Sequence, residues 1–174
     1  MELFDAVCKR VSVRDYKEKN VPRQLLIKLI DAARRAPSAR AVEPWEFVVI
    51  RKKESLAQLG KIVSPNGSFI GQAAAAVAIY CRETKYYLED GCAATENLLL
   101  MAVDLGLGAC WIAGDKKPYA EKVNKFLGID TGMKLVSLIS LGWPKTDALQ
   151  KKNRKADDVI HWEKFQEQLF IKEE

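Results

Sequence analysis

The sequence predicts a layered domain of the α/β or α+β class, in which helices cover both faces of one central sheet. Three observations lead to this class. Helical and strand-like apolar patterns alternate along the chain. The 174 residues, 48% of them hydrophobic, suit one domain with a substantial core, so we expect residues 1–174 to form a single domain. No repeat or low-complexity segment interrupts the pattern.

In the first half of the chain, apolar spacing and proline positions define the elements. Pro22 suits the first position of a helix, apolar residues then recur at helical spacing, and Pro37 prevents that helix from continuing. The predicted elements are, in order, a helix over 3–7, a helix over 22–36, a strand over 45–50, a helix over 56–62, a turn over 65–68 and a strand over 74–81.

In the second half, residues 88–105 are apolar on most faces, which predicts a central helix that is buried all round. We expect Gly106 and Gly108 to end this helix. The remaining predicted elements are a strand over 109–113, a helix over 118–127, a strand over 135–141 and an amphipathic segment over 160–170 that packs against another surface.

Charge and cysteine content narrow the functional classes. The net charge of +5 allows an acidic ligand, but 28 basic residues are interleaved with 23 acidic ones, whereas nucleic-acid binders concentrate their positive charge. The four cysteines form no Cys-x-x-Cys pair and His161 is the single histidine, so we expect no metal site and reduced, buried thiols. The first residues form no apolar stretch with a cleavage site, and the most apolar run, residues 73–81, is too short to span a bilayer. We therefore expect a cytoplasmic location.

A segment with alternating cationic and hydroxyl side chains lies near the N-terminus. In an extended backbone Arg10, Ser12 and Arg14 project to one face, while Val11 and Val13 project to the other. Arginine offers a fork of donors suited to phosphate, and serine adds a short donor. The segment is therefore either a solvated edge of the structure or an anion-binding site.

Motifs for binding a nucleotide through backbone groups are missing from the sequence. No Gly-x-Gly-x-x-Gly loop follows a predicted strand, because the Gly-x-Gly at residues 106–108 follows a helix instead. A phosphorylated cofactor would therefore be bound by side chains. Residues 34–45 form either a plain helix-to-strand loop or, through the small residues Ser38 and Ala39, a place where a flat ligand approaches the backbone closely.

Five segments together resemble the FMN-dependent nitroreductase family. They are Arg-x-Ser-x-Arg at 10–14, Ala-Pro-Ser followed by Pro-Trp at 36–45, Leu-Gly-Leu-Gly-Ala-Cys-Trp-Ile at 105–112, Leu-Gly-Trp-Pro at 141–144 and Lys-x-Arg at 152–154. The resemblance covers essentially the whole chain. It implies an α+β fold with a central mixed, mainly antiparallel sheet covered by helices on both faces, and a homodimer with FMN at the subunit interface.

The same resemblance assigns roles to individual residues. It implies that FMN contacts Arg10, Val11, Ser12, Arg14, Pro37, Ser38, Ala39, Trp111, Ile112, Ala113, Gly114, Lys152 and Arg154. Arg10, Ser12, Lys152 and Arg154 would hold the phosphate and ribityl end, and Arg14 would lie near the pyrimidine edge of the ring. The Ala113 N–H would face flavin N5, and residues 37–39 would come from the other subunit.

The resemblance also implies an activity. NADH or NADPH would deliver hydride to the flavin, and an electron-poor acceptor such as a nitro compound or quinone would then take its place, which gives ping-pong kinetics. The chemistry would be done at flavin N5, so no side chain is assigned as a catalytic acid, base or nucleophile. A cation at Arg14 would favour the reduced, more anionic ring and so tune its potential.

Two departures from the family pattern and three alternatives stay open. Ala41 and Glu43 stand where the family usually has amides, and we expect Glu43 to turn away from the ring and pair with Arg40 or Arg35. The stretch from residue 81 to 90 is short, which predicts an open acceptor pocket. The alternatives are a non-catalytic binder of FMN or another phosphorylated ligand, a module for nucleic acid or an acidic partner, and a flavin enzyme acting on a different acceptor, such as a reductive dehalogenase.

Overall fold

A computed structural model describes residues 1–129, 132–146 and 152–165. Within these ranges the strands form one four-stranded sheet in the order β1-β2-β4-β3, and all three strand pairs are antiparallel. The strands are β1 (Trp45–Ile50), β2 (Ala75–Arg82), β3 (Gly108–Ala113) and β4 (Met133–Gly142). β3 lies at the end of this order, so one of its edges pairs with β4 and its other edge pairs with no strand of the sheet; we call the latter the free edge of β3.

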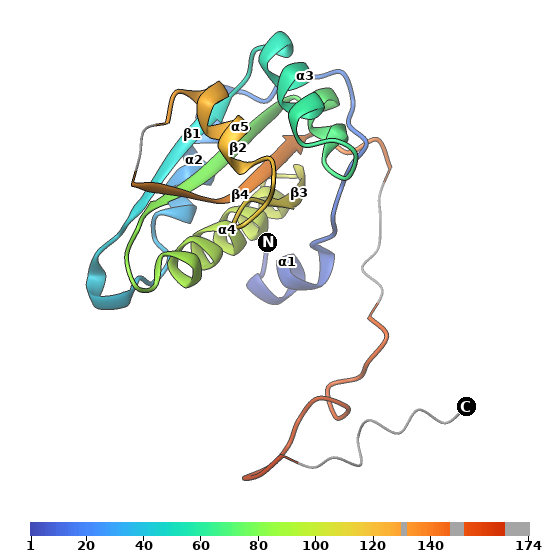
Figure 1. The fold of residues 1–174 in the computed structure, drawn as a ribbon. Coiled ribbons are helices and arrows are strands. Elements are labelled where there is room, and N and C mark those ends of the chain that lie inside the picture. The colour runs from blue at the N-terminus through green and yellow to red at the C-terminus, as the bar shows by residue number, and fades with distance from the viewer. Residues whose placement is uncertain (130–131, 147–151, 166–174) are drawn as a thin grey trace.

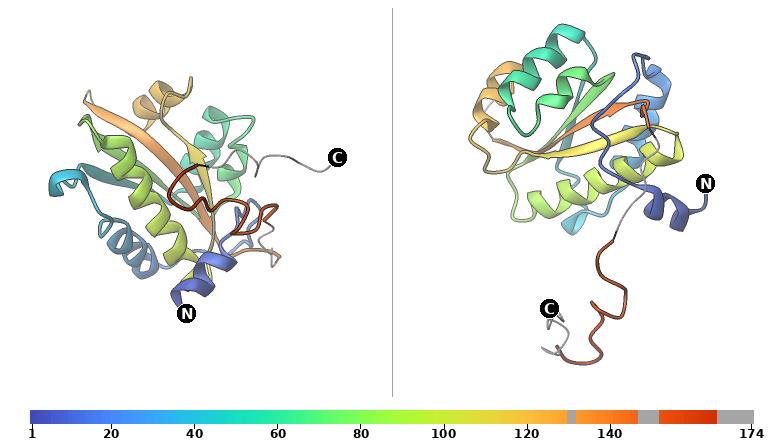
Figure 2. Two further views of the ribbon diagram at one scale, coloured as in Figure 1. Left: turned by 90° about the horizontal axis from the view of Figure 1, so that it is seen from below. Right: turned by 90° about the vertical axis from the view of Figure 1, so that its right-hand side faces the viewer.

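Helices cover both faces of this sheet (Figure 1). The helices are α1 (Leu3–Lys9), α2 (Arg23–Ala33), α3 (Lys53–Ile62), α4 (Tyr87–Asp104) and α5 (Ala120–Leu127), with short 3-10 helices η1 (Ala39–Ala41) and η2 (Ser68–Gln72). Figure 2 shows α2 and α4 on one side of the strands, and α3 and α5 on the other. The layers match the predicted architecture.

The alternation of side chains along β2 explains the two layers. Val77 and Ile79 belong to the core cluster that contains α2 and α4, whereas Ala78 and Tyr80 belong to the cluster that contains α3, α5 and η2. Successive side chains of a strand point to opposite faces, so a strand whose residues are almost all apolar is buried on both sides. The central strand thus divides the core into two clusters.

The predicted element order and the α+β class are confirmed, with small shifts of boundaries. The helix predicted from residue 56 begins at Lys53, and the one predicted from residue 118 begins at Ala120. Gly106 ends α4 in a left-handed conformation as expected, with φ of 71°, but Gly108 is the first residue of β3 rather than part of the helix stop. Parallel pairing occurs, within the described residues, at the isolated bridge between Ser12 and Ala109.

Two expectations from the sequence are wrong or incomplete. Cys8 is exposed on α1, although we expected buried thiols; Cys81 and Cys110 are buried, Cys92 is half-buried, and all four are free. Residues 160–165 form no helix and stand away from the sheet (Figure 1), so the described part of the amphipathic segment does not pack on this chain. The rest of that segment, residues 166–170, lies outside the described residues.

Among the described residues, the structure contains no helix with the length and apolar character needed to cross a membrane.

Candidate functional site

The N-terminal segment carrying Arg10, Ser12 and Arg14 lies along the edge of β3. Ser12 forms a parallel bridge with Ala109, and the N–H of Val13 donates to the carbonyl of Ala109 at 2.9 Å. A Cβ on Gly108 would lie 2.7 Å from the Val13 side chain, so this close approach requires glycine at position 108. The segment is thus extended, as predicted, and its central residues Ser12 and Val13 pair with Ala109 of β3.

Tyr16 fixes the far end of the same segment. Its hydroxyl donates to the carbonyl of Val13 at 2.6 Å and lies 2.7 Å from Ser140 Oγ on β4. Burial raises the pKa of Tyr16, which keeps the phenol protonated and able to donate. A Cβ on Gly142 would lie 2.6 Å from the Tyr16 ring, so a second glycine gives this side chain its space.

A cavity of about 430 Å³ brings together predicted site residues from three parts of the chain. It is lined by Val7, Arg10, Ser12, Glu96, Leu99, Trp111 and Lys152. The cations and the hydroxyl therefore converge on one space, which is what an anion-binding site requires. Glu96, which the sequence analysis missed, lies 4.0 Å from Arg10 and helps to orient its guanidinium. Its signal in the sequence was a carboxylate in the middle of a largely apolar helix.

Cys110 lies beneath this site as a buried thiol. Burial raises its pKa, and the nearby charges of Arg14 and Arg10, with a hydrogen bond from Ser12, offset only part of that effect. The thiol is therefore protonated at neutral pH and serves as core material rather than as a nucleophile.

The edge of β3 next to the cavity offers backbone groups that point away from the sheet. The N–H of Gly114 donates to the carbonyl of Val136 on β4 at 3.0 Å. Backbone groups of successive residues in an antiparallel strand point alternately to its two edges, so the N–H and C=O of Ala113 point to the free edge. Ala113 is exposed, and the hydroxyl of Tyr119 donates to its carbonyl. The Ala113 N–H is thus directed to the side where the sequence analysis placed a ligand.

Arg14 is held beside this edge by two contacts. Its guanidinium carbon lies 5.5 Å from the centroid of the Phe69 ring, and its Nη1 donates to the carbonyl of Ser12 at 3.2 Å. Phe69 comes from η2, which packs on the same face of the sheet as Ile112. Nothing in the local sequence around Phe69 signals this contact, because its partner is more than fifty residues earlier in the chain.

The loop over residues 37–43 does not line the cavity of its own chain. The buried Asp90 accepts a hydrogen bond from the Ala39 N–H at 2.9 Å, and Ser38 Oγ accepts one from the Glu43 N–H at 3.0 Å. Arg40, Ala41 and Glu43 all have left-handed φ angles, of 57°, 53° and 47°. Such a backbone is costly for residues other than glycine and persists when other contacts enforce it, as Asp90 and Ser38 do here.

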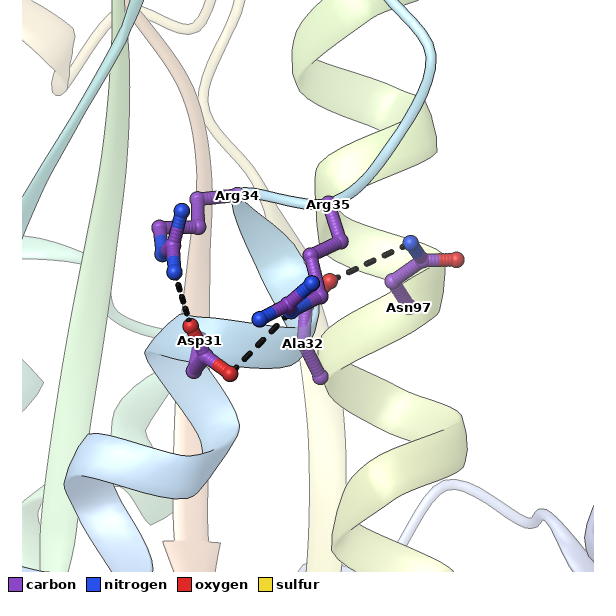
Figure 3. Close-up of polar contacts among 5 residues, drawn as sticks. All are labelled: Asp31, Ala32, Arg34, Arg35 and Asn97. Atoms are coloured by element: carbon purple, nitrogen blue, oxygen red, sulfur yellow. Dashed lines mark hydrogen bonds and ion pairs between the residues drawn. The ribbon is translucent and has the colours of Figure 1, made fainter.

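The expected partner of Glu43 is occupied elsewhere. Arg35 and Arg34 both pair with Asp31 at the end of α2, and the Arg35 Nε to Asp31 Oδ2 distance is 3.1 Å (Figure 3). The side chain of Glu43 is exposed and takes part in none of the ion pairs among the described residues. The predicted pairing with Arg40 or Arg35 is therefore wrong. Asp31 lies one helical turn from Arg35 and pairs with it instead, and Arg40 takes part in none of the ion pairs among the described residues either.

Arg154 is also placed differently from Lys152. Lys152 lines the cavity, whereas the guanidinium of Arg154 donates to the carbonyl of Asp158 within its own segment. Of the predicted site residues, the structure brings Arg10, Ser12, Trp111 and Lys152 together at this cavity. The others do not line it: Val11, Arg14, residues 37–39, residues 112–114 and Arg154.

A larger groove of about 690 Å³ lies between α1, α2 and α4, away from this site. Its lining includes the apolar side chains of Leu100 and Met101 and the charged side chains of Asp31 and Arg35. Asn97 on α4 donates to the carbonyl of Ala32 at 3.2 Å and ties the two long helices together beside the groove (Figure 3). A lining that mixes apolar and charged side chains is typical of surfaces that contact another protein.

A family model described as the nitroreductase family matches residues 7–90 and 82–143. The chain belongs to the nitroreductase family. It is 31% identical over 171 residues to a protein of Methanothermobacter thermautotrophicus provisionally named NADH dehydrogenase/NAD(P)H nitroreductase, covering 95% of this chain and 88% of that protein. It is 25% identical to the NADH dehydrogenase of Thermus thermophilus, covering 90% of this chain and 94% of the relative.

A solved structure supports the same family assignment. The FMN-dependent nitroreductase from Clostridium difficile R20291 superposes with a TM-score of 0.84 at 29% identity, covering 93% of this chain and 99% of that chain. The predicted resemblance to the nitroreductase family is thus confirmed, together with the fold that it implied.

Proposed function

We propose that this nitroreductase-family chain is a cytoplasmic FMN-dependent oxidoreductase that takes electrons from NADH or NADPH and reduces an electron-poor acceptor such as a nitro compound or a quinone. The observation that carries the proposal is the convergence of Arg10, Ser12 and Lys152 on one cavity beside the free edge of β3. Relatives named as NAD(P)H nitroreductases and an FMN-dependent nitroreductase of the same fold support it.

The residues around the cavity fit the phosphate end of FMN. A phosphate dianion needs cationic and hydroxyl donors to offset its loss of hydration, and Arg10, Ser12 and Lys152 supply them. Arg154 would join them after a change in its own segment, and Val11 would contribute its backbone. When bound, FMN supplies a ring that accepts a hydride equivalent and passes electrons on to an acceptor.

The backbone of residues 111–114 fits the flat part of the cofactor. Trp111, Ile112, Ala113 and Gly114 would border the ring, with the outward N–H of Ala113 as the donor nearest to its reactive edge. The Tyr119 hydroxyl donates to the Ala113 carbonyl and so helps to fix the next peptide, between Ala113 and Gly114. Arg14 would place its positive charge where the reduced ring is most negative. These groups orient and stabilise, and none of them needs to form a covalent bond with substrate.

Two copies of the chain would complete the site. Pro37, Ser38 and Ala39 do not reach the cavity of their own chain, so in this proposal they reach that of a second copy. The exposed apolar side chains Leu3 and Phe4 on α1, with exposed fractions of 71% and 78%, and the adjoining groove between α1, α2 and α4 are suited to burial between copies. Residues 1–174 would thus act as one FMN-binding domain of a homodimer.

The test is the colour of the purified protein and its response to reductant. The protein is expected to be yellow, or to become yellow with added FMN, and to bleach when NADH or NADPH is added without oxygen. A colourless protein that cannot be reconstituted with FMN would overturn the proposal. A yellow protein that neither nucleotide bleaches would instead indicate a non-catalytic flavin binder.

A further inference from the structure

Arg14 is oriented by an aromatic ring rather than by a carboxylate. Its guanidinium lies over the Phe69 ring, 5.5 Å from the centroid, while Nη1 donates to the Ser12 carbonyl. One contact sets the position of the guanidinium and the other sets its rotation. An exposed arginine would otherwise sample many rotamers.

Phe69 is itself rigidly placed. It lies on η2, where the neighbouring Ile70 is fully buried, and its own side chain packs against the core cluster shared by α3 and α5. A Cβ on Gly60 would lie 2.8 Å from the Ser68 carbonyl oxygen and 3.1 Å from the Gly71 Cα, so η2 and α3 are in close backbone contact. The ring therefore provides a fixed surface for Arg14.

The charge of Arg14 is left uncompensated by this arrangement. Its neighbour Asp15 pairs with Lys145 at 2.8 Å, and Glu96 is 4.0 Å from Arg10. In residues 1–129, 132–146 and 152–165, Arg14 takes part in none of the ion pairs. A carboxylate would orient the guanidinium but cancel its field, whereas an aromatic face attracts the cation without neutralising it.

We propose that Phe69 is a positioning residue that holds Arg14 as an uncompensated cation beside the free edge of β3 and thereby raises the reduction potential of the bound flavin. The inference rests on the proposed function, because it assigns the charge of Arg14 to the ring of FMN. A reduced flavin ring is more negative than an oxidised one, so a fixed cation stabilises the reduced form more. Phe69 acts through Arg14 and touches neither substrate nor the reacting atoms.

The experiment compares the affinities of the protein for reduced and oxidised FMN. In Phe69→Leu the preference for reduced over oxidised FMN is expected to fall about three- to tenfold, and tenfold corresponds to about 30 mV for a two-electron couple. Phe69→Tyr, which keeps the aromatic face, should retain the wild-type preference. Phe126→Leu makes the same change in an aromatic residue of α5 that packs on the same cluster, and should leave the preference unchanged.

A double-mutant cycle separates positioning from a general packing effect. In an Arg14→Ala background, Phe69→Leu should produce no further change in the preference for reduced FMN. An equal change in both backgrounds, or no change in Phe69→Leu alone, would overturn the inference.

A measurement without FMN distinguishes failure of this inference from failure of the proposed function. The Phe69 ring current should move the Arg14 side-chain protons upfield in the NMR spectrum of the free protein, and Phe69→Leu should remove that shift. Free protein without the shift would disprove the placement of Arg14. A protein that shows the shift but binds no FMN would refute the proposed function, and with it the effect on potential.

Discussion

Lys152 reaches the cavity from a segment far along the chain from Arg10 and Ser12, with which it shares that space. In the proposed complex it contacts the phosphate of FMN, so Lys152→Ala should raise the dissociation constant of FMN about tenfold to a hundredfold. This range follows from about 1.5–3 kcal/mol for a hydrogen bond to a charged group. The midpoint potential should stay nearly unchanged, because the phosphate is remote from the ring. Titration of the free protein with FMN measures the first quantity, and redox titration the second.

The control for Lys152 is Lys122→Ala, which removes the same charge from α5 on the opposite face of the sheet. Its FMN affinity should match that of the wild type. Arg154→Ala should also raise the dissociation constant of FMN if Arg154 exchanges its hydrogen bond with Asp158 for one with the phosphate. Normal retention of FMN together with a large change of potential would contradict the phosphate role of either residue.

The role of Tyr16 in holding the N-terminal segment can be tested by a single substitution and without a cofactor. Tyr16→Phe removes the donor to the Val13 carbonyl and the partner of the buried Ser140 hydroxyl. Leaving buried polar groups without partners costs about 1–3 kcal/mol, so the free energy of unfolding should fall by that amount in urea denaturation. Tyr86→Phe, at an exposed tyrosine, should be nearly neutral. Equal stability of the two variants would mean that the Tyr16 hydroxyl does not fix the segment.

Among the elements, β3 determines where the N-terminal segment lies. Gly108→Ala would place a methyl group 2.7 Å from the Val13 side chain and push the segment away from the strand. We expect a loss of about 1–3 kcal/mol in the free energy of unfolding, the usual cost of overpacking, together with weaker FMN binding. Urea denaturation and FMN titration measure the two effects.

A second glycine provides the comparison for Gly108. At Gly71 an added Cβ would have ordinary contacts, the nearest at 3.5 Å, so Gly71→Ala should be neutral or slightly stabilising. If Gly108→Ala kept both wild-type stability and FMN affinity, the close approach of Val13 to β3 would not matter for the site.

The role of Gly108 also shows where prediction from sequence stops. The apolar periods of α2, β1 and α4 lie within the elements themselves. The ends of β1 and α4 were predicted to within one residue, and α2 ends three residues before the predicted position. Gly108, Phe69 and Asp90 act through partners that lie far away in the sequence, at Val13, Arg14 and Ala39. No local pattern marks such pairs. The alternation of Arg10, Ser12 and Arg14 pointed to part of the site beforehand, and the family resemblance added Trp111 and Lys152, which line the same cavity.

At the scale of the whole molecule, the exposed apolar side chains of α1 are suited to burial against a second copy. We predict that the protein is a dimer in light scattering and that Phe4→Glu, which puts a charge on a side chain with an exposed fraction of 78%, shifts it toward monomer and weakens FMN retention. Val49→Glu changes an exposed apolar residue on β1, outside the proposed surface, and should stay dimeric. A monomeric wild-type protein that retains FMN would exclude a site shared between copies.

The pairing of the N-terminal segment with late strands has a consequence for the synthesis of the protein. Ser12 pairs with Ala109, and Tyr16 contacts Ser140 and Pro144. The N-terminal segment therefore cannot form these contacts until the late strands have been synthesised. Before β4 has emerged from the ribosome, the segment that carries Arg10, Ser12 and Arg14 cannot be held in its final position. In the proposed complex these side chains hold FMN, so FMN should bind only when translation is nearly complete, and chains truncated before β4 should emerge without flavin.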